Sequence, residues 1–153
     1  RVAFGTGDMG VMMKTRGEPF KRHDDQEGVA DNWVMDLSFD SEGRLWVATC
    51  TRGVSVYEDG SWRTITRRDG LIDDYALAVK GIGADMWIGT LSGISILTPE
   101  GMINLDTDDG LSGNEIHDFL LHEGYVYVAT DGGLSVVEVP VGAVRPTKGK
   151  GGA

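Results

Sequence analysis

A five-residue pattern occurs four times in this chain, and it constrains the fold more than any other feature. Each copy is an apolar run that ends in a small residue followed by threonine. The four copies are residues 2–6 (VAFGT), 45–49 (LWVAT), 86–90 (MWIGT) and 126–130 (VYVAT). Their threonines lie 43, 41 and 40 residues apart. A period near forty residues is typical of stacked units, none of which can bury its apolar face alone.

The segments around each copy predict a four-stranded antiparallel meander, because short runs rich in Val, Ile, Thr and aromatic residues alternate with Gly and Asp turns. The complete units have predicted strands at 34–39, 45–49, 53–57 and 62–66, and at 76–80, 86–90, 93–97 and 102–106. The first unit lacks an opening strand and the fourth lacks a clear last strand; their predicted strands are 2–6, 10–14, 20–23, 116–121, 125–130 and 133–139. No stretch of twelve or more residues has a helical period.

Many short strands separated by glycine turns predict an all-β sandwich, barrel or propeller. The period selects the β-propeller, since one four-stranded blade takes about 40–45 residues. We predict about 3.5–4 four-stranded antiparallel blades in units of about 1–28, 29–70, 71–110 and 111–140, followed by a flexible or strand-donating C-terminal tail at 141–153. Propellers usually have four to eight blades, so we expect part of a larger ring or a ring completed by another chain.

Charge and composition limit the partners that this chain can have. The formal net charge is −10, and all the acidic residues precede the tail. A protein with this much negative charge repels phosphate backbones, so nucleic acid is not expected as a partner. No apolar run is long enough to span a bilayer. The single cysteine, Cys50, excludes an intrachain disulfide framework.

The same residues that define the units resemble the two-component regulator propeller repeat. Its pattern of Asp-Gly-Leu, Asn or Asp, Trp, Gly-Thr and Gly-Leu-Ser is read here as Asp69-Gly70-Leu71, Asp74, Trp87, Gly89-Thr90 and Gly93-Ile94-Ser95. It recurs as Asp109-Gly110-Leu111, Asn114, Tyr127, Ala129-Thr130 and Gly133-Leu134-Ser135, and in part from Gly28 to Ser55. The resemblance covers nearly everything before Pro140. It implies a seven- to eight-bladed propeller, often periplasmic or extracellular, that senses a ligand for a histidine kinase.

The loops that lead into the opening strand of each unit are the candidate binding site. In a propeller these loops surround the mouth of the central channel, where ligands usually bind. The candidate ligand-binding residues are Asp31, Asn32, Trp33, Asp73, Asp74, Tyr75, Asn114, Glu115 and His117. Carboxylate and amide oxygens suit a small polyhydroxylated ligand or glycan, with Trp33 and Tyr75 as stacking platforms. They also suit a hard cation such as calcium, although no Asp-x-Asp-x-Asp-Gly spacing occurs and no other cofactor is indicated.

A structural interpretation of the same loops competes with the functional one. Asp, Asn and Gly bond nearby backbone amides and tolerate left-handed conformations, so they are also the residues that turns need. Their repetition in each unit favours this interpretation, because a ligand site seldom needs every blade equally. Other repeated residues have predicted structural roles, with aromatic side chains packing between blades and threonines closing strand ends. These structural residues are Thr6, Trp46, Thr49, Trp87, Thr90, Tyr127 and Thr130.

Three functions remain open from the sequence. The first is a non-catalytic binding or interaction module, which fits the sensor resemblance. The second is a structural subunit completed by a protein partner or by self-association, because the incomplete first and last units leave unpaired strand edges. The third is a polysaccharide lyase or hydrolase that uses acidic and histidine residues at the channel mouth, with His117 as the candidate histidine.

Overall fold

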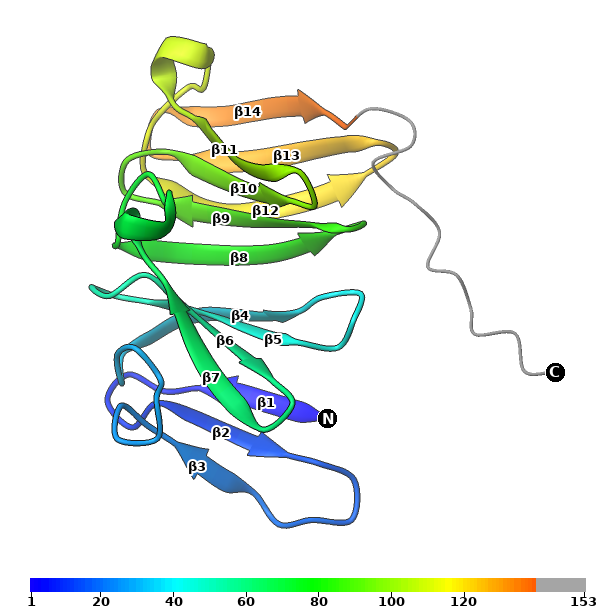
Figure 1. Ribbon diagram of the computed structural model, residues 1–153. Helices are drawn as coiled ribbons and strands as arrows, with labels where there is room; N and C mark the ends of the chain where they lie inside the picture. Colours follow the sequence, from blue (N-terminus) through cyan, green and yellow to red (C-terminus); the bar gives the residue numbers. More distant parts are fainter. Residues whose placement is uncertain (140–153) are drawn as a thin grey trace, which may run out of the picture.

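The computed structural model describes residues 1–139, which form four antiparallel sheets arranged one after another along the chain (Figure 1). The four sheets are blades 1 to 4 below. Blade 1 contains β1 (Val2–Gly5), β2 (Val11–Lys14) and β3 (Lys21–His23); blade 2 contains β4 (Val34–Phe39), β5 (Leu45–Thr49), β6 (Val54–Glu58) and β7 (Ser61–Ile65). Blade 3 contains β8 (Ala76–Ile82), β9 (Asp85–Thr90), β10 (Ile94–Thr98) and β11 (Gly101–Leu105); blade 4 contains β12 (Ile116–His122), β13 (Tyr125–Thr130) and β14 (Gly133–Glu138).

Every blade is a simple meander in which each strand pairs with the next one along the chain. The opening strand β8 contacts both β4 and β12, so these three are the inner strands of the propeller. The β-propeller fold expected from the repeats is confirmed, with predicted strand ends within two residues of those observed. Within residues 1–139, blade 1 has no inner strand and blade 4 has no outer strand. The expected tail at 141–153 lies outside the described residues.

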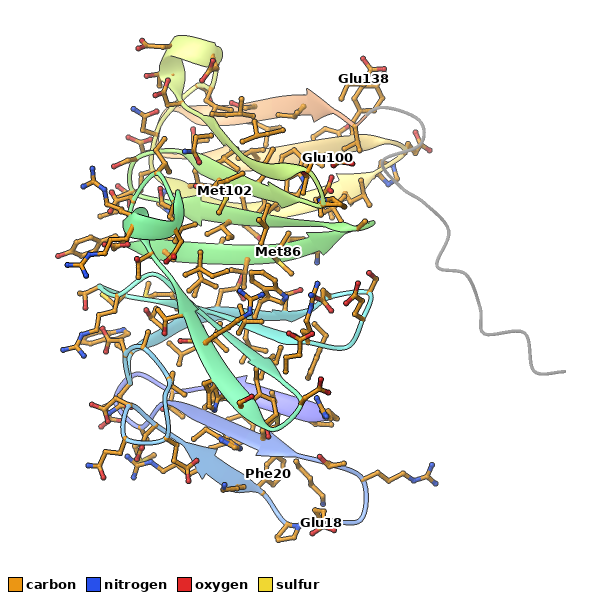
Figure 2. The ribbon with its side chains drawn as sticks, viewed as in Figure 1. Glu18, Phe20, Met86, Glu100, Met102 and Glu138 are labelled. Carbon is orange, nitrogen blue, oxygen red and sulfur yellow. The ribbon has the colours of Figure 1, made fainter. Side chains whose placement is uncertain are left out.

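The core lies between the blades, because alternate residues of each strand face the preceding and the following blade. Leu45 and Val47 of β5 pack toward blade 1, whereas Trp46 and Ala48 pack toward blade 3. Figure 2 shows Met86 of β9 in the space between blades 2 and 3, where it joins the cluster around Trp46. Trp87, its neighbour in sequence, faces blade 4 and meets Phe119 at 5.9 Å between ring centroids.

The repeated threonines stabilise the end of β1, β5, β9 and β13, which are equivalent strands in the four blades. Each threonine hydroxyl donates to the carbonyl of the glycine that precedes or begins the next strand. The bonds are Thr6 to Gly10 at 2.9 Å, Thr49 to Gly53 at 2.8 Å, Thr90 to Gly93 at 2.9 Å and Thr130 to Gly133 at 2.9 Å. A threonine with the same bond four times over has a structural role, because its hydroxyl already satisfies a strand-end carbonyl.

Two short helical turns interrupt the connections between blades, and the sequence did not reveal them. They are the 3-10 turns η1 (Arg67–Asp69) and η2 (Thr107–Asp109). In η1 the Asp69 carboxylate accepts the Thr66 N–H at 2.9 Å, Gly70 adopts a left-handed φ of 110°, and Leu71 is buried. The Asp-Gly-Leu motif thus encodes a capped turn that ends in a core residue. Among residues 1–139 these turns are the only helices, and neither could cross a membrane.

Candidate functional site on the loop face

The loops that enter the inner strands gather at one end of the blades, together with the connections between the second and third repeat strands (left in Figure 1). We call this end the loop face. An Asn or Asp side chain at one repeat position closes each entering loop. Asn32 accepts the Asp25 N–H at 2.9 Å, Asp74 accepts the Arg67 N–H at 2.7 Å, and Asn114 accepts the Thr107 N–H at 2.9 Å. Three of the nine candidate residues therefore hold their own loop in shape.

Two further acidic residues orient the backbone before the inner strands of blades 2 and 3. Asp31 accepts the Trp33 N–H at 3.1 Å, and Asp73 accepts the Tyr75 N–H at 3.0 Å. Their other oxygens accept hydroxyl protons from Thr51 and Ser92 on the neighbouring connection. Burial opposes ionisation of Asp31, but the Thr51 hydroxyl and the Trp33 N–H outweigh it and hold the pKa of this carboxyl below its ordinary value. Both carboxylates are thus engaged within the protein.

The residues two positions after these carboxylates remain exposed to solvent. Trp33 is 57% exposed and Tyr75 is 45% exposed, although both are large aromatic side chains. They occupy the same repeat position, because the Cys50 N–H donates to the Trp33 carbonyl and the Leu91 N–H donates to the Tyr75 carbonyl. Glu115 has this position in blade 4, where its carbonyl accepts the Asp131 N–H. Two aromatic side chains and one carboxylate therefore immediately precede three successive inner strands.

His117 follows in the inner strand β12, beside Glu115. Its Nε2 lies 3.9 Å from the Glu115 carboxylate, and both side chains are about half exposed. Met35 has the corresponding place in blade 2 and is 42% exposed. At these two positions the exposed side chains are thus apolar in blade 2, with Trp33 and Met35, and ionisable in blade 4, with Glu115 and His117.

The loop face is not uniformly acidic. The entering loop of blade 3 carries Arg67 and Arg68 against Asp69, Asp73 and Asp74. An open cavity of about 780 Å³ between blades 2 and 3 is lined by Arg52, Arg68, Thr51, Thr64 and Asp74, among others. Negative charge therefore concentrates in the loops of blades 2 and 4, and the junction between blades 2 and 3 presents guanidinium and hydroxyl groups.

Sequence reasoning missed the buried serines that anchor the entering loops. Ser55 accepts the Ala30 N–H at 2.8 Å, Ser95 accepts the Ile72 N–H at 2.9 Å, and Ser135 accepts the Ser112 N–H at 2.8 Å. These are the serines of the repeated Gly-x-Ser motif, and in blade 1 Met12 stands at the same place. The recurrence of a small hydroxyl residue in an apolar strand was the signal that could have identified them.

Within residues 1–139 no three or more His, Cys, Asp or Glu side chains come together in a group that could bind a metal ion. Cys50 is half-buried and free.

Known proteins share this architecture. The family model of the two component regulator propeller matches residues 28–51, which confirms the resemblance over that segment. The extracellular domain of BT3049 from B. thetaiotaomicron, described as a hybrid two component system, is similar with a TM-score of 0.78 and 20% identity; the match covers 91% of this chain and 20% of that one. The extracellular domain of BT4673 from the same organism, described as a one component system, is similar with a TM-score of 0.70 and 15% identity. That match covers 91% of this chain and 20% of the other.

A more distant similarity extends to an enzyme. Virginiamycin B lyase from Staphylococcus aureus, in a catalytically inactive form with quinupristin, has a TM-score of 0.56 and 14% identity, and the match covers 87% of this chain and 50% of the lyase. The chain thus spans about a fifth of the two extracellular domains and half of the lyase. No curated protein matches the sequence. At these identities the structural likeness shows the propeller fold.

Proposed function

We propose that this chain is a non-catalytic, extracytoplasmic sensing module that binds a glycan or another small polyhydroxylated ligand on its loop face. The observation that supports this most is the exposure of Trp33 and Tyr75 at one repeat position. Aromatic rings present a large, rigid apolar surface at low cost in conformational entropy. The sensing role is supported by the two extracellular domains, which belong to systems described as two component and one component.

The backbone around the two rings is held in place before any ligand arrives. The Trp33 N–H is bonded to Asp31 and its carbonyl to Cys50, while Tyr75 has the equivalent bonds to Asp73 and Leu91. A pre-ordered backbone lowers the entropy that binding would otherwise lose. We therefore assign Asp31, Asn32, Asp73, Asp74 and Asn114 to positioning, and Trp33, Tyr75, Glu115 and His117 to direct ligand contact.

Calorimetric titration with neutral oligosaccharides tests the proposal. The double variant Trp33→Ala/Tyr75→Ala is expected to weaken binding at least tenfold, since loss of one aromatic stacking contact costs about 0.5–1.5 kcal/mol beyond lost area. Tyr125→Ala is the matched control, because Tyr125 is 42% exposed but begins β13 at the opposite end of the blades. Unchanged affinity in the double variant would contradict the proposal.

A lyase or hydrolase is the second candidate function. It is favoured by the Glu115–His117 pair at 3.9 Å and by the similarity to a lyase. A general acid–base role needs such groups within reach of a substrate proton. Turnover of polysaccharide or ester substrates that His117→Ala abolishes would replace the binding-module proposal with this one.

A further inference from the structure

The junction between blades 2 and 3 carries positive charge on the loop face, in a protein whose formal net charge is −10. Arg52 and Arg68 line the open cavity of about 780 Å³ at this junction, and both residues are exposed. Of the described residues that line the cavity, only Asp74 is acidic, so two arginines and one aspartate give the lining a formal charge of +1. Within residues 1–139 neither guanidinium forms an ion pair, whereas Arg22 and Arg44 do. Both guanidinium groups are therefore available to a ligand.

The turn before blade 3 does not need an arginine at position 68. The Arg68 N–H is bonded to the side chain of the residue two positions before it. The N–H groups of Gln26 and Asp108, at the same repeat position in two other loops, are bonded in the same way. Glutamine, arginine and aspartate thus serve this backbone position equally well, and the geometry of the turn does not account for the Arg68 guanidinium.

Arg52 is an additional residue in its connection. Residues 50–52 join the repeated threonine of blade 2 to the next glycine, whereas only residues 91–92 do so in blade 3. Blade 1 has a connection of the same length as blade 2, with Met9 in the place of Arg52. The Arg52 Nη1 lies 3.5 Å from the Ala30 carbonyl oxygen, which is too long for a strong hydrogen bond. The connection therefore does not require this guanidinium either.

The junction between blades 3 and 4 has the opposite charge at the equivalent places. Asp108 takes the place of Arg68 there, and Asp106 precedes it by two residues. The shorter connection of blade 3 ends in the uncharged Ser92. Side chains that recur in every blade are those that the fold requires, whereas the two guanidinium groups occur together at one junction. Such a local departure from the repeat is what a ligand site needs.

We propose that this cavity, called the guanidinium cavity below, binds the carboxylate or sulfate group of an acidic saccharide. The proposal rests on the ligand class proposed above for the loop face and makes that class specific. Guanidinium groups present paired N–H donors that match two oxygens of such an anion. The cavity volume lies within the roughly 300–1,000 Å³ of small-molecule sites. A lining charge of +1 suits a singly charged group better than a phosphate monoester, which carries about −1.5 to −2 charges at pH 7.

The guanidinium cavity lies beside the two aromatic side chains that we assigned to ligand contact. Asp74, which lines the cavity, directly precedes Tyr75. Thr51, which also lines it, directly follows Cys50, and the Cys50 N–H donates to the Trp33 carbonyl. One saccharide can therefore stack a sugar ring on an aromatic side chain while its acidic group reaches a guanidinium. A neutral saccharide would use the aromatic contacts alone.

Calorimetric titration of the 153-residue chain with three saccharides tests the proposal. The probes are oligogalacturonate, its neutral methyl ester, and a carrageenan oligosaccharide whose acidic groups are sulfate esters. The tighter-binding acidic probe is expected to bind at least tenfold more tightly than the neutral ester, as a hydrogen bond to a charged group provides. Comparison of the two acidic probes distinguishes a carboxylate from a sulfate. Added salt should reduce the advantage of the acidic probe and leave the affinity of the ester unchanged.

The double variant Arg52→Gln/Arg68→Gln should bind the acidic probe and the ester with equal affinity. Its circular dichroism spectrum should be unchanged, because both arginines are exposed. Arg16→Gln is the matched control for the loss of positive charge. Arg16 is exposed in the connection between β2 and β3, at the opposite end of the blades, so this variant should retain the tenfold advantage.

The outcomes separate this proposal from the one on which it rests. An ester that binds as tightly as both acidic probes, or an advantage that survives in the double arginine variant, would overturn the guanidinium cavity and leave the aromatic contacts in place. An acidic probe that requires the two arginines but binds Trp33→Ala/Tyr75→Ala with full affinity would support the cavity and overturn the aromatic contacts. Absence of binding for all three probes would overturn both proposals.

Discussion

The Asp131 carboxylate occupies the space that a Cβ on Gly113 would need. In blades 2 and 3 the position of Gly113 is held by Asp31 and Asp73, which bond the N–H before the inner strand. In blade 4 that N–H belongs to Glu115 and is bonded at 3.1 Å by Asp131, which comes from the opposite connection. The carboxylate has changed its place in the sequence and kept its place in space. A carboxylate therefore accepts the equivalent N–H in blades 2, 3 and 4, which indicates that its role is to hold the loop geometry.

Gly113→Ala is therefore expected to destabilise blade 4. The added Cβ would displace the Asp131 carboxylate and approach the Gly132 N at 2.5 Å, which should cost about 1–3 kcal/mol in the free energy of unfolding. Urea denaturation measures the change. Gly7→Ala is the matched control, because a Cβ at Gly7 would have no other atom within 4 Å. An Ala variant as stable as the unaltered chain would show that the loop moves freely.

Ser95→Ala tests the buried serine that anchors the entering loop of blade 3. Ser95 is fully buried, accepts the Ile72 N–H at 2.9 Å and donates to Asn104 at 2.7 Å. Its removal leaves the partly buried Ile72 N–H without a partner, so we expect a loss of about 1–3 kcal/mol in urea denaturation. The exposed Ser61, which bonds only the Glu58 carbonyl at 3.2 Å, is the matched control. Equal effects of Ser95→Ala and Ser61→Ala would contradict the anchoring role.

Trp46→Ala and Tyr127→Ala compare one repeat position in two environments. Trp46 is 1% exposed between blades 2 and 3, and its indole N–H donates to Asp40 at 2.8 Å. Tyr127 lies on the face of blade 4 that carries the exposed Leu120 and Val136, and it is only partly buried. Chemical denaturation should show a loss of about 3–5 kcal/mol for Trp46→Ala. The loss for Tyr127→Ala should be markedly smaller, and equal losses would contradict this account of the core.

The buried His23 should make stability fall as the pH falls. Burial lowers the pKa of His23 from its ordinary 6.5, and the pull of Glu27 and Asp24 only partly offsets this. The ring lies among Tyr57, Trp62 and Lys21, and its Nδ1 accepts the Trp62 N–H at 3.3 Å. Since the folded state releases the proton more readily than the unfolded one, this contribution is complete above about pH 6.5 and is lost as the pH falls through the folded pKa.

Urea denaturation at pH 7.5 and pH 5 measures this dependence (two values on either side of about 6.5). His23→Leu should flatten it, because Leu105 holds the same register position in blade 3 and does not titrate. His122→Leu is the matched control, since the His122 side chain is 64% exposed. A steep pH dependence that survives in His23→Leu would assign the effect to other groups.

The strands and the stacking of blades could be predicted because their signals are local. The repeat places Leu45–Thr49 and its counterparts in equivalent strands, and alternation along each strand assigns its two faces. The capped turns η1 and η2 were missed because three-residue turns leave no periodic pattern.

The sequence by itself determined the all-β repeat architecture of this protein, since strand alternation and Gly-Asp turns act over a few residues. Only the tertiary structure decided what the loop residues do. Asp31 and Thr51 lie twenty residues apart, and Ser95 and Ile72 twenty-three, so their bonds exist only once neighbouring strands have paired. Once these strands have paired, the polar loop side chains are hydrogen-bonded within the protein. The carbonyl groups of Trp33 and Tyr75 are hydrogen-bonded too, whereas their rings remain exposed to solvent.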